Sequence, residues 1–506
     1  MNHNNSIELR NGSTAVDIRN IPVIGYQPFF EEVCGLLASS SNHCLSYYCL
    51  PSSDRIRFVC CIADDKTGTV RVISHEAPRG GSPLKSLTSL VPAMHIFERE
   101  IHENHGVAFT EHPWLKPVRY PHDRADMQSV MTNYPFYEID GEELHEVGVG
   151  PIHAGVIEPG HFRFICNGEK VLHLEIHLGY QHRGVEKLFL SAKNPLQRAI
   201  LAENIAGDTA IGHGLVHAQL IESLSGIEIC EALQIERCIA LEMERIAVHI
   251  GDTAALCGDV AYQLGQVGCE ALRTMVINTT QQWCGNRFGK GLIRPGGTNN
   301  HLTDEMADMI LQVLGEVEMR FSDLADRIYS LPSVLGRFED IGTVTRQQAG
   351  LLGAVGMAAR TCGISRDTRM THPFQYYRKY KVIPVVLESG DVLARGMLRA
   401  REVRSSAAII RELIGAWRGT EKAVGGPVYD YSLRPGSFAV SVAEGWRGEI
   451  CHTALTDSEG RISHYKVKDP SQHNWMALAL AVRNQEISDF PVCNKSFNLS
   501  YCGHDL

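Results

Sequence analysis

Three features that would quickly assign a function are absent from this sequence. No two cysteines are spaced as CxxC, so metal sites built on paired CxxC thiolates are excluded. No apolar run approaches the roughly 18 to 20 residues that cross a bilayer. The opening MNHNNSIELRNGS also lacks the basic and apolar regions of a secretory signal. If a membrane is involved, we expect a partner to supply the anchor.

Dense runs of Lys and Arg and glycine-rich phosphate loops are missing as well. The formal net charge is −10, and nothing resembles the basic footprint of a nucleic-acid-binding protein, so we expect no nucleic acid partner. No GxGxxG follows a strand-like segment, and NAD binding to this chain is therefore not expected.

The composition is that of a globular protein with more than one domain. The chain has 506 residues, of which 44% are hydrophobic and 21% are charged. Its 15 cysteines form an odd number without a regular framework, which indicates free thiols in a reducing, cytoplasmic compartment. Several are expected to be small buried hydrophobes. These are Cys60, Cys61, Cys166, Cys230 and Cys238.

The patterning predicts an α+β chain in which a small N-terminal α+β domain precedes a large, mostly helical domain with a small sheet. Residues 1–125 contain strand-like segments at 57–62 and 69–74 and a helical pattern that ends at Gly106. Residues 126–147 lack a period and are expected to be a linker. The second domain, 148–506, is expected to hold long helices between 188 and 335. Later helices are expected at 346–360 and 391–418, and a strand followed by a helix at 461–487.

The densest polar motifs open this second domain. GPIHAGVIEPGHFRF (150–164) and HLEIHLGYQHRGVEK (173–187) flank an Asn-Gly pair at 167–168, which predicts a hairpin. His182, Arg183, Glu186 and Lys187 are expected at the start of a long helix, where Arg183 and Lys187 would share a face. The alternative for this stretch is a solvated helix start with a local ion pair.

GPxH, EPGHFR and LGYxHRGxEK, in this order, resemble the large subunit of membrane-bound, energy-converting nickel-iron hydrogenases of the formate hydrogenlyase or hydrogenase-4 type. The related complex I large subunit is similar but differs between these motifs. The later blocks ERIAVHIGD, RPGGT, ARTCGISRDTR and EGWRGEICH look like those of the same family. FEREIHENHGV and EHPWL resemble the complex I small subunit, here fused at the N-terminal side.

The metal ligands depart from this resemblance. A nickel-iron centre needs four thiolates from two CxxC motifs. In this chain Ala206 and Thr209 stand in the first pair of positions, and Ser500 and Gly503 in the second. We call these pairs the first and second ligand slots. No metal bound by this chain is expected. Another metal at Cys493 and Cys502 with His504 and Asp505 is an alternative to free thiols.

The resemblance implies that the cavity between the slots is retained and used for proton-coupled electron transfer. Glu158 matches the proton gate of nickel-iron hydrogenases, and a carboxylate in an apolar cavity suits proton relay. A carboxylate satisfied by local backbone donors is the alternative. Groups near the slots could give protons to a quinone-like substrate. They are His153, His161, His182, Asp208 and His213.

Arg183 and Glu186 would face a 4Fe-4S cluster held by the partner subunit, where a fixed cation raises the cluster potential. A structural ion pair is an equal alternative to a functional role for three other arginines, Arg360, Arg366 and Arg447. The hypothesis is the large subunit of an oxidoreductase complex at the cytoplasmic side of the inner (plasma) membrane, peripheral to it and coupled to ion or proton translocation. Its expected partners are a small iron-sulfur subunit, a ferredoxin-like subunit and antiporter-like membrane subunits. The rivals are a true hydrogenase with unusual ligands and a non-catalytic scaffold or coupling subunit.

Overall fold

The computed structural model describes residues 5–153 and 157–506. At the N-terminal side, an antiparallel sheet in the order β1-β6-β5-β4 carries β3 in parallel beside β6. Its strands are β1 (Ile7–Arg10), β3 (Val23–Ile24), β4 (Asn42–Pro51), β5 (Arg55–Asp64) and β6 (Thr69–Pro78). Helices α1 (Tyr26–Leu37) and α2 (His95–His105) pack on it, and β7 (Leu84–Lys85) pairs with β8 (Phe109–Thr110). This is the α+β unit expected from the sequence.

A second sheet ties the N-terminal segment to the C-terminal part of the chain. Its order is β16-β15-β14-β2, and β2 (Val16–Asp17) pairs with the start of β14. The other strands are β14 (Ser437–Glu444), β15 (Glu449–Thr456) and β16 (Ile462–Lys468). Side chains of both sheets, among them Tyr48, Val59 and Val442, form one buried apolar cluster. The N-terminal unit is therefore packed against the sheet that follows the helical bundle.

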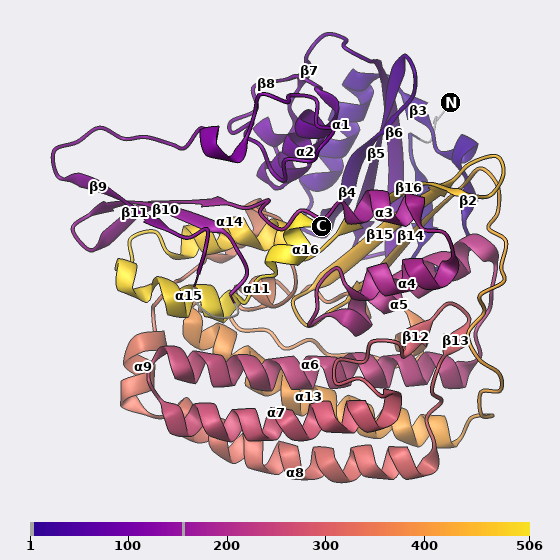
Figure 1. Ribbon diagram of the computed structural model, residues 1–506, viewed down its shortest axis with the longest axis vertical. Helices are drawn as coiled ribbons and strands as arrows, with labels where there is room; N and C mark the ends of the chain where they lie inside the picture. The colour runs from indigo at the N-terminus through magenta and orange to yellow at the C-terminus, as the bar shows by residue number, and fades with distance from the viewer. Residues whose placement is uncertain (1–4, 154–156) are drawn as a thin grey trace.

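A layer of long helices forms the side of the molecule away from the N-terminal sheet (Figure 1). Its members are α6 (Glu231–Asp259), α7 (Gln263–Cys284), α8 (Asp304–Ile328) and α13 (Val392–Arg418). Helix α6 packs on both α7 and α13, and α8 also packs on α7 and α13. Helix α5 (Ala210–Ser225) lies between this layer and the second sheet, and almost every residue of α5 is buried.

Shorter elements connect these layers. The third sheet is a hairpin of β10 (His161–Asn167) and β11 (Lys170–His177) with β9 (Leu144–Val149) at its edge. Short helices follow it: α3 (Val185–Ser191), α4 (Pro195–Glu203), α9 (Pro332–Phe338), α10 (Arg346–Leu351), α11 (Gly356–Arg360) and α12 (Thr368–Thr371). The pair β12 (Ile293–Arg294) and β13 (Gly297–Thr298) lies beside α5. Helices α14 (Ser471–Ala481), α15 (Phe490–Phe497) and α16 (Tyr501–Asp505) end the chain.

Several local expectations are confirmed and others are wrong. The hairpin at Asn167-Gly168, the helix that stops before Gly106 and the final strand-helix pair are all present. The stretch expected to be a linker ends in strand β9, because its residues pair with the free edge of β10. The helix expected at 346–360 is divided in two, since Gly353 and Gly356 both adopt positive φ.

A further correction concerns the motif HRGVEK. The expected long helix is only α3, which begins at Val185 after Gly184 in the left-handed region. Arg183 therefore precedes the helix and does not share a face with Lys187. No helix of the described residues is both long and apolar enough to span a membrane.

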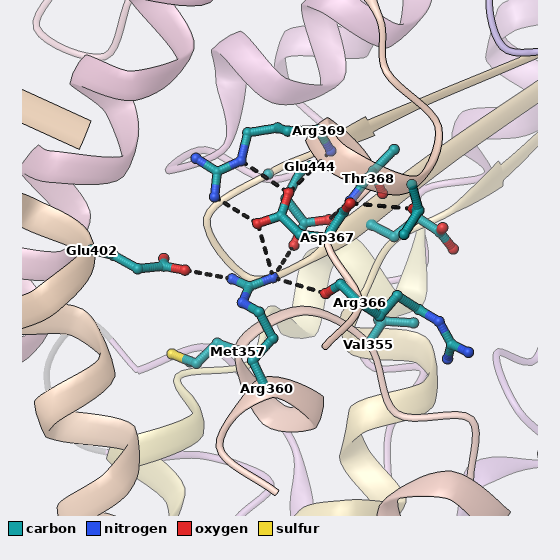
Figure 2. Close-up of polar contacts among 12 residues, drawn as sticks. Val355, Met357, Arg360, Arg366, Asp367, Thr368, Arg369, Glu402 and Glu444 are labelled. Atoms are coloured by element: carbon teal, nitrogen blue, oxygen red, sulfur yellow. Dashed lines mark hydrogen bonds and ion pairs between the residues drawn. The ribbon is translucent and has the colours of Figure 1, made fainter. Parts of the chain in front are cut away.

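A buried arginine holds four elements together (Figure 2). Arg360, at the end of α11, donates to Glu444 of β14 at 2.6 Å and to Glu402 of α13 at 2.7 Å. It also lies 3.5 Å from Asp367, the residue that caps α12. Burial opposes the charge on Arg360, but the three carboxylates outweigh burial and raise the pKa of the guanidinium. The expectation that Arg360 is a structural ion-pair residue agrees with this geometry.

Replacing Arg360 by Met should strongly destabilise the protein. The variant leaves three carboxylates in the interior without their shared cation, which costs about 3 to 5 kcal/mol when one partner of a buried pair is removed. Arg461→Met is the matched control, because Arg461 makes an exposed pair with Asp457. Thermal unfolding should show a large loss for Arg360→Met and no resolved loss for Arg461→Met. Equal midpoints for the two variants would contradict the structural role.

Acidification below neutral pH should also destabilise the fold. Burial lowers the pKa of His95 and of His217 from 6.5 to about 3, and lowers those of His105, His112 and His177 to about 4. As pH falls through 6.5, the unfolded chain takes up protons that the folded chain does not bind, so stability is lost. Each such histidine adds a slope of about 1.4 kcal/mol per pH unit.

The midpoint temperature of thermal unfolding should thus decrease as the pH is lowered from 7 to 5, a range in which most carboxylates do not yet titrate. His95 stacks on Trp114, so His95→Phe keeps an aromatic ring there and removes one titrating group. Its midpoint should depend less steeply on pH than that of the wild type. An identical pH dependence would show that burial of His95 does not contribute.

Candidate functional site

The two ligand slots lie in one region of the folded chain, and Arg183 joins them. Its guanidinium donates to the carbonyl oxygens of Asn204 at 2.7 Å and Ile205 at 2.9 Å, just before the first slot. It also donates to the carbonyl oxygen of Cys502 at 2.9 Å, inside the second slot. Segments from distant parts of the chain thereby meet at the point where the resemblance placed a metal.

The first slot is a turn that leads into α5. The Thr209 amide donates to the Ala206 carbonyl at 3.0 Å, and both side chains are buried. Arg447 donates to both oxygens of the Asp208 carboxylate, at 2.6 and 2.7 Å, and to the Thr209 hydroxyl at 3.1 Å. The same arginine donates to the Asn498 carbonyl at 2.6 Å, so it also bridges toward the second slot.

The second slot is the start of α16. The Ser500 hydroxyl accepts a hydrogen bond from the Gly503 amide at 2.9 Å and caps this short helix. A Cβ atom at Gly503 would lie 2.7 Å from the Asp469 carboxyl group. Asp469 in turn accepts a hydrogen bond from His213 at 3.0 Å. The Asp469 carboxyl group and the Ser500 hydroxyl thus lie where a cysteine side chain at this position would have to project.

These residues do not fit a nickel-iron centre. Ala206, Thr209, Ser500 and Gly503 supply no thiolate, and only the thiolate form of cysteine binds such metals. Cys502 is the nearest thiol, but burial and the adjacent Glu158 raise its pKa to about 11. No group of three or more His, Cys, Asp or Glu residues within 5–153 and 157–506 is arranged to hold a metal ion.

Glu158 lies beside the second slot on a loop that two histidines fasten. Glu158 is close enough to Cys502 and Tyr501 to raise the pKa of each, although burial is the larger cause for both. His153 donates to the Gly160 carbonyl at 2.9 Å, and His161 donates to the Gly150 carbonyl at 3.1 Å. Part of this loop, residues 154–156, lies outside the described residues. His153 and His161 thus make hydrogen bonds that stabilise the segment that carries Glu158.

The HRGVEK motif is divided between the slots and a neighbouring pocket. Arg183 faces the slots, as described, and His182 donates to the Asp505 carbonyl at 2.7 Å. Glu186 accepts from the Val467 amide at 3.0 Å and pairs with Lys466 at 3.0 Å, while Lys187 pairs with Asp123. A pocket of about 450 Å³ opens here. It is lined by His182, Glu186, Lys187 and residues of α2 and β16, among others.

His213, Asp208 and Glu158 thus surround the slots, and the structure adds two groups that the sequence analysis does not assign to the site. Asp469 is not among the candidate residues, and Arg447 is considered only as a structural ion-pair residue. A motif could have suggested both, since Arg447 follows Trp446 in EGWRGEICH and Asp469 lies in KDPSQHNW. Burial alone would raise the pKa of Asp469, but the hydrogen bond from His213 and the charge of Arg447 lower it. Asp469 is therefore a buried carboxylate in its ionised form.

Within the described residues, no cysteine belongs to a group of three or more His, Cys, Asp or Glu residues that could hold a metal ion. Cys493 is buried, and burial raises the pKa of its thiol to about 12. Of the five cysteines expected to be buried, Cys230 is exposed, because it lies just before α6 and does not belong to the helix core. Arg366 pairs with Asp65 of the N-terminal unit at 2.7 Å, which fits the structural alternative for this residue.

Adding a side chain at Gly503 should disturb the second slot. Gly503→Ala places a methyl group against the buried Asp469 carboxyl, and such overpacking costs about 1 to 3 kcal/mol. Gly207→Ala is the matched control in the first slot, because no atom lies within 4 Å of the place that its methyl group would take. Thermal unfolding should separate the two variants. If Gly503→Ala is as stable as Gly207→Ala, the packing of Asp469 against this slot is wrong.

Comparison with known proteins identifies relatives of this chain. Residues 266–424 match the family of the respiratory-chain NADH dehydrogenase 49 Kd subunit, and residues 29–136 match that of the 30 Kd subunit. Hydrogenase-4 component G of Escherichia coli (strain K12) is 25% identical, with 82% of this chain and 74% of the relative covered. Formate hydrogenlyase subunit 5 of the same organism is 26% identical, with 86% and 78% covered.

An NADH-quinone oxidoreductase subunit of Phocaeicola vulgatus is 25% identical, over 68% of this chain and 72% of the relative. The relatives are thus subunits of oxidoreductase complexes of both kinds that the sequence motifs indicated. Two segments of the chain thus match the 49 Kd and 30 Kd subunit families of respiratory-chain NADH dehydrogenase, and the chain is a homologue of hydrogenase and NADH-quinone oxidoreductase subunits.

Proposed function

We propose that this chain is the catalytic-type large subunit of a membrane-associated oxidoreductase complex that works without a nickel-iron centre. Electrons arrive from a 4Fe-4S cluster in a small partner subunit, and the region between the two ligand slots is where they leave the complex. Glu158 and the neighbouring acid-base groups supply protons there. The complex lies at the cytoplasmic side of the plasma membrane and couples electron transfer to ion or proton translocation.

One observation carries this proposal: the chain keeps proton-handling groups around the slots and lacks the four thiolates that a nickel-iron centre needs. Glu158, Asp208, His213 and Asp469 lie at or beside the slots, whereas all four thiolate positions are substituted. An acceptor that takes up protons together with electrons suits such a site. Quinones belong to this class, and one of the relatives is a subunit of an NADH-quinone oxidoreductase.

The face around HRGVEK supports the proposed partner. The lining of the 450 Å³ pocket there combines apolar side chains with charged and polar ones, which include Glu186 and Lys187. Arg183 belongs to the same motif, and its guanidinium donates to carbonyl groups at both ligand slots. A small iron-sulfur subunit docked on this face would bring its cluster near Arg183. A ferredoxin-like subunit and antiporter-like membrane subunits make up the rest of the proposed complex.

The purified complex should contain no stoichiometric nickel and should reduce decylubiquinone with reduced methyl viologen as the donor. Glu158→Gln should lower this turnover by about a hundredfold, because a positioned proton-transfer group typically contributes at least that factor. Glu421→Gln is the control, as Glu421 is an exposed carboxylate beyond α13. Assembly of the complex, followed by gel filtration, should be the same for both variants.

Two results would contradict the proposal. Stoichiometric nickel together with hydrogen-dependent dye reduction would identify a true hydrogenase with unusual ligands. An assembled Glu158→Gln complex that turns over as the wild type does would favour a scaffold or coupling subunit.

A further inference from the structure

A chain of hydrogen bonds runs from the second slot into the interior. His213 contacts Asp469 through Nε2 at 3.0 Å and His452 through Nδ1 at 3.1 Å. His452 contacts the Tyr465 hydroxyl through Nδ1 at 2.8 Å, and this hydroxyl contacts Nδ1 of His217 at 2.9 Å. The five side chains are all at most 1% exposed. His213, His452 and Tyr465 therefore each bond to a neighbour on both sides. Of the five residues, only His213 is expected at the site from the sequence.

Two elements give this chain its geometry. His213 and His217 are one turn apart on α5 and so project from the same face of the helix. His452 of β15 is paired with Val467 of β16, so Tyr465, two residues along β16, lies on the same face of the sheet as His452. Helix α5 packs on this sheet, as Figure 1 shows, and brings the two pairs into contact. The ring of Tyr465 is fixed by stacking on Phe189, with centroids 3.9 Å apart and planes within 9°.

With one proton on each histidine, hydrogen-bonding rules give this series of contacts a single direction. The ionised Asp469 can only accept, so His213 must carry its proton on Nε2. In the tautomer with its proton on Nε2, His213 accepts at Nδ1 from Nε2–H of His452. By the same reasoning Nδ1 of His452 accepts from the Tyr465 hydroxyl, and the Tyr465 oxygen accepts from Nδ1–H of His217. Every donor points toward Asp469.

Two observations are consistent with neutral inner members. Burial raises the pKa of Tyr465 well above its ordinary value. Burial, together with the neighbouring His213 and His217, lowers the pKa of His452 well below its ordinary value. Around His217, burial is again the main cause of the lowered pKa, and Arg198 of α4 and Arg294 of β12 add to it. These groups do not store protons at neutral pH but can pass them on.

The interior end of this series of hydrogen bonds, at His217, has an unpartnered nitrogen. With a proton on Nδ1, His217 has a free lone pair on Nε2. This buried atom has no hydrogen-bond partner among the described residues. A buried unpartnered acceptor is uncommon. The other end, at Asp469, lies against Gly503 in the second ligand slot.

We infer that His217, Tyr465, His452 and His213 form a directed proton relay that delivers protons to Asp469 at the second ligand slot. A proton that binds Nε2 of His217 releases the Nδ1 proton to the Tyr465 oxygen. Tyr465 passes its own proton to Nδ1 of His452, the Nε2 proton of His452 moves to Nδ1 of His213, and the Nε2 proton of His213 moves to Asp469. One proton enters, one is delivered, and no bond other than O–H and N–H changes.

The relay rests on the proposed function, because it names the route by which protons reach the reduced acceptor. Glu158 is a separate group at the second slot, near Cys502 and Tyr501. The acceptor would then have two proton sources. The relay begins at His217, which is buried in the protein interior. Glu158, in contrast, lies on a half-buried surface loop.

The first test reads the direction of the hydrogen bonds in the full chain. Nitrogen NMR of protein labelled with ¹⁵N-histidine should show the proton on Nε2 in His213 and His452 and on Nδ1 in His217. Tyr465→Phe keeps the stacked ring but removes the hydroxyl, so His217 should become a mixture of tautomers while His213 and His452 stay unchanged. A proton on Nδ1 of His452 in the wild type would overturn the relay.

The second test measures turnover of the assembled complex with reduced methyl viologen and decylubiquinone. Tyr465→Phe should lower kcat by about a hundredfold, with KM for decylubiquinone unchanged and a larger solvent deuterium isotope effect. Tyr47→Phe is the control, because Tyr47 is equally buried and its hydroxyl has no partner among the described residues. His452→Gln retains a donor toward His213 but cannot pass a proton, and should behave like Tyr465→Phe.

The outcomes separate the relay from the function on which it rests. If Glu158→Gln abolishes turnover while Tyr465→Phe and His452→Gln turn over as the wild type does, the relay is wrong and the proposed function stands. If the wild-type complex does not reduce decylubiquinone, the proposed function fails, and the tautomers alone then support or overturn the directed chain.

Discussion

Arg360 is surrounded by carboxylates that belong to three different elements, and the interior of the large domain is organised around this contact. Glu402 lies on α13, Glu444 ends β14 and Asp367 caps α12, so one guanidinium fixes a helix of the bundle, a sheet and a loop relative to one another (Figure 2). Charges in a dry interior are tolerated only when they are paired and fully hydrogen-bonded. Movement of any one of these elements would break the pairing, which makes their arrangement specific.

The candidate site depends on this framework. Glu444 ends β14, and Arg447 follows three residues later in the turn to β15, from where it reaches Asp208. His452 and Tyr465 lie on the strands that continue from this turn. The position of the sheet therefore sets both the bridge between the ligand slots and the chain of hydrogen bonds that ends at Asp469. A site that has lost its thiolates remains ordered because buried ion pairs and hydrogen bonds join the same segments.

Much of the fold could be predicted from local patterns. The helical periods of α6, α7, α8 and α13 and the Asn167-Gly168 hairpin are visible because each buries one face or needs one turn residue. Strands β14 and β15 are not apparent in the sequence, since every residue in both is buried and no alternation of polar and apolar residues remains. The helix expected from His182 onward is wrong at Gly184, whose left-handed conformation delays the start of α3.

The sequence by itself determined the relationship to hydrogenase and complex I large subunits and the substitution of the four thiolate positions, because ordered motifs and missing thiolates need no coordinates. It also marked Glu158, Asp208 and His213 as groups near the slots. Only the tertiary structure decided that Arg447 pairs with Asp208 and that Asp469 accepts from His213, although each pair is more than 200 positions apart in the chain. Local periodicity records which face of an element is buried, whereas packing between layers selects the side chains that meet.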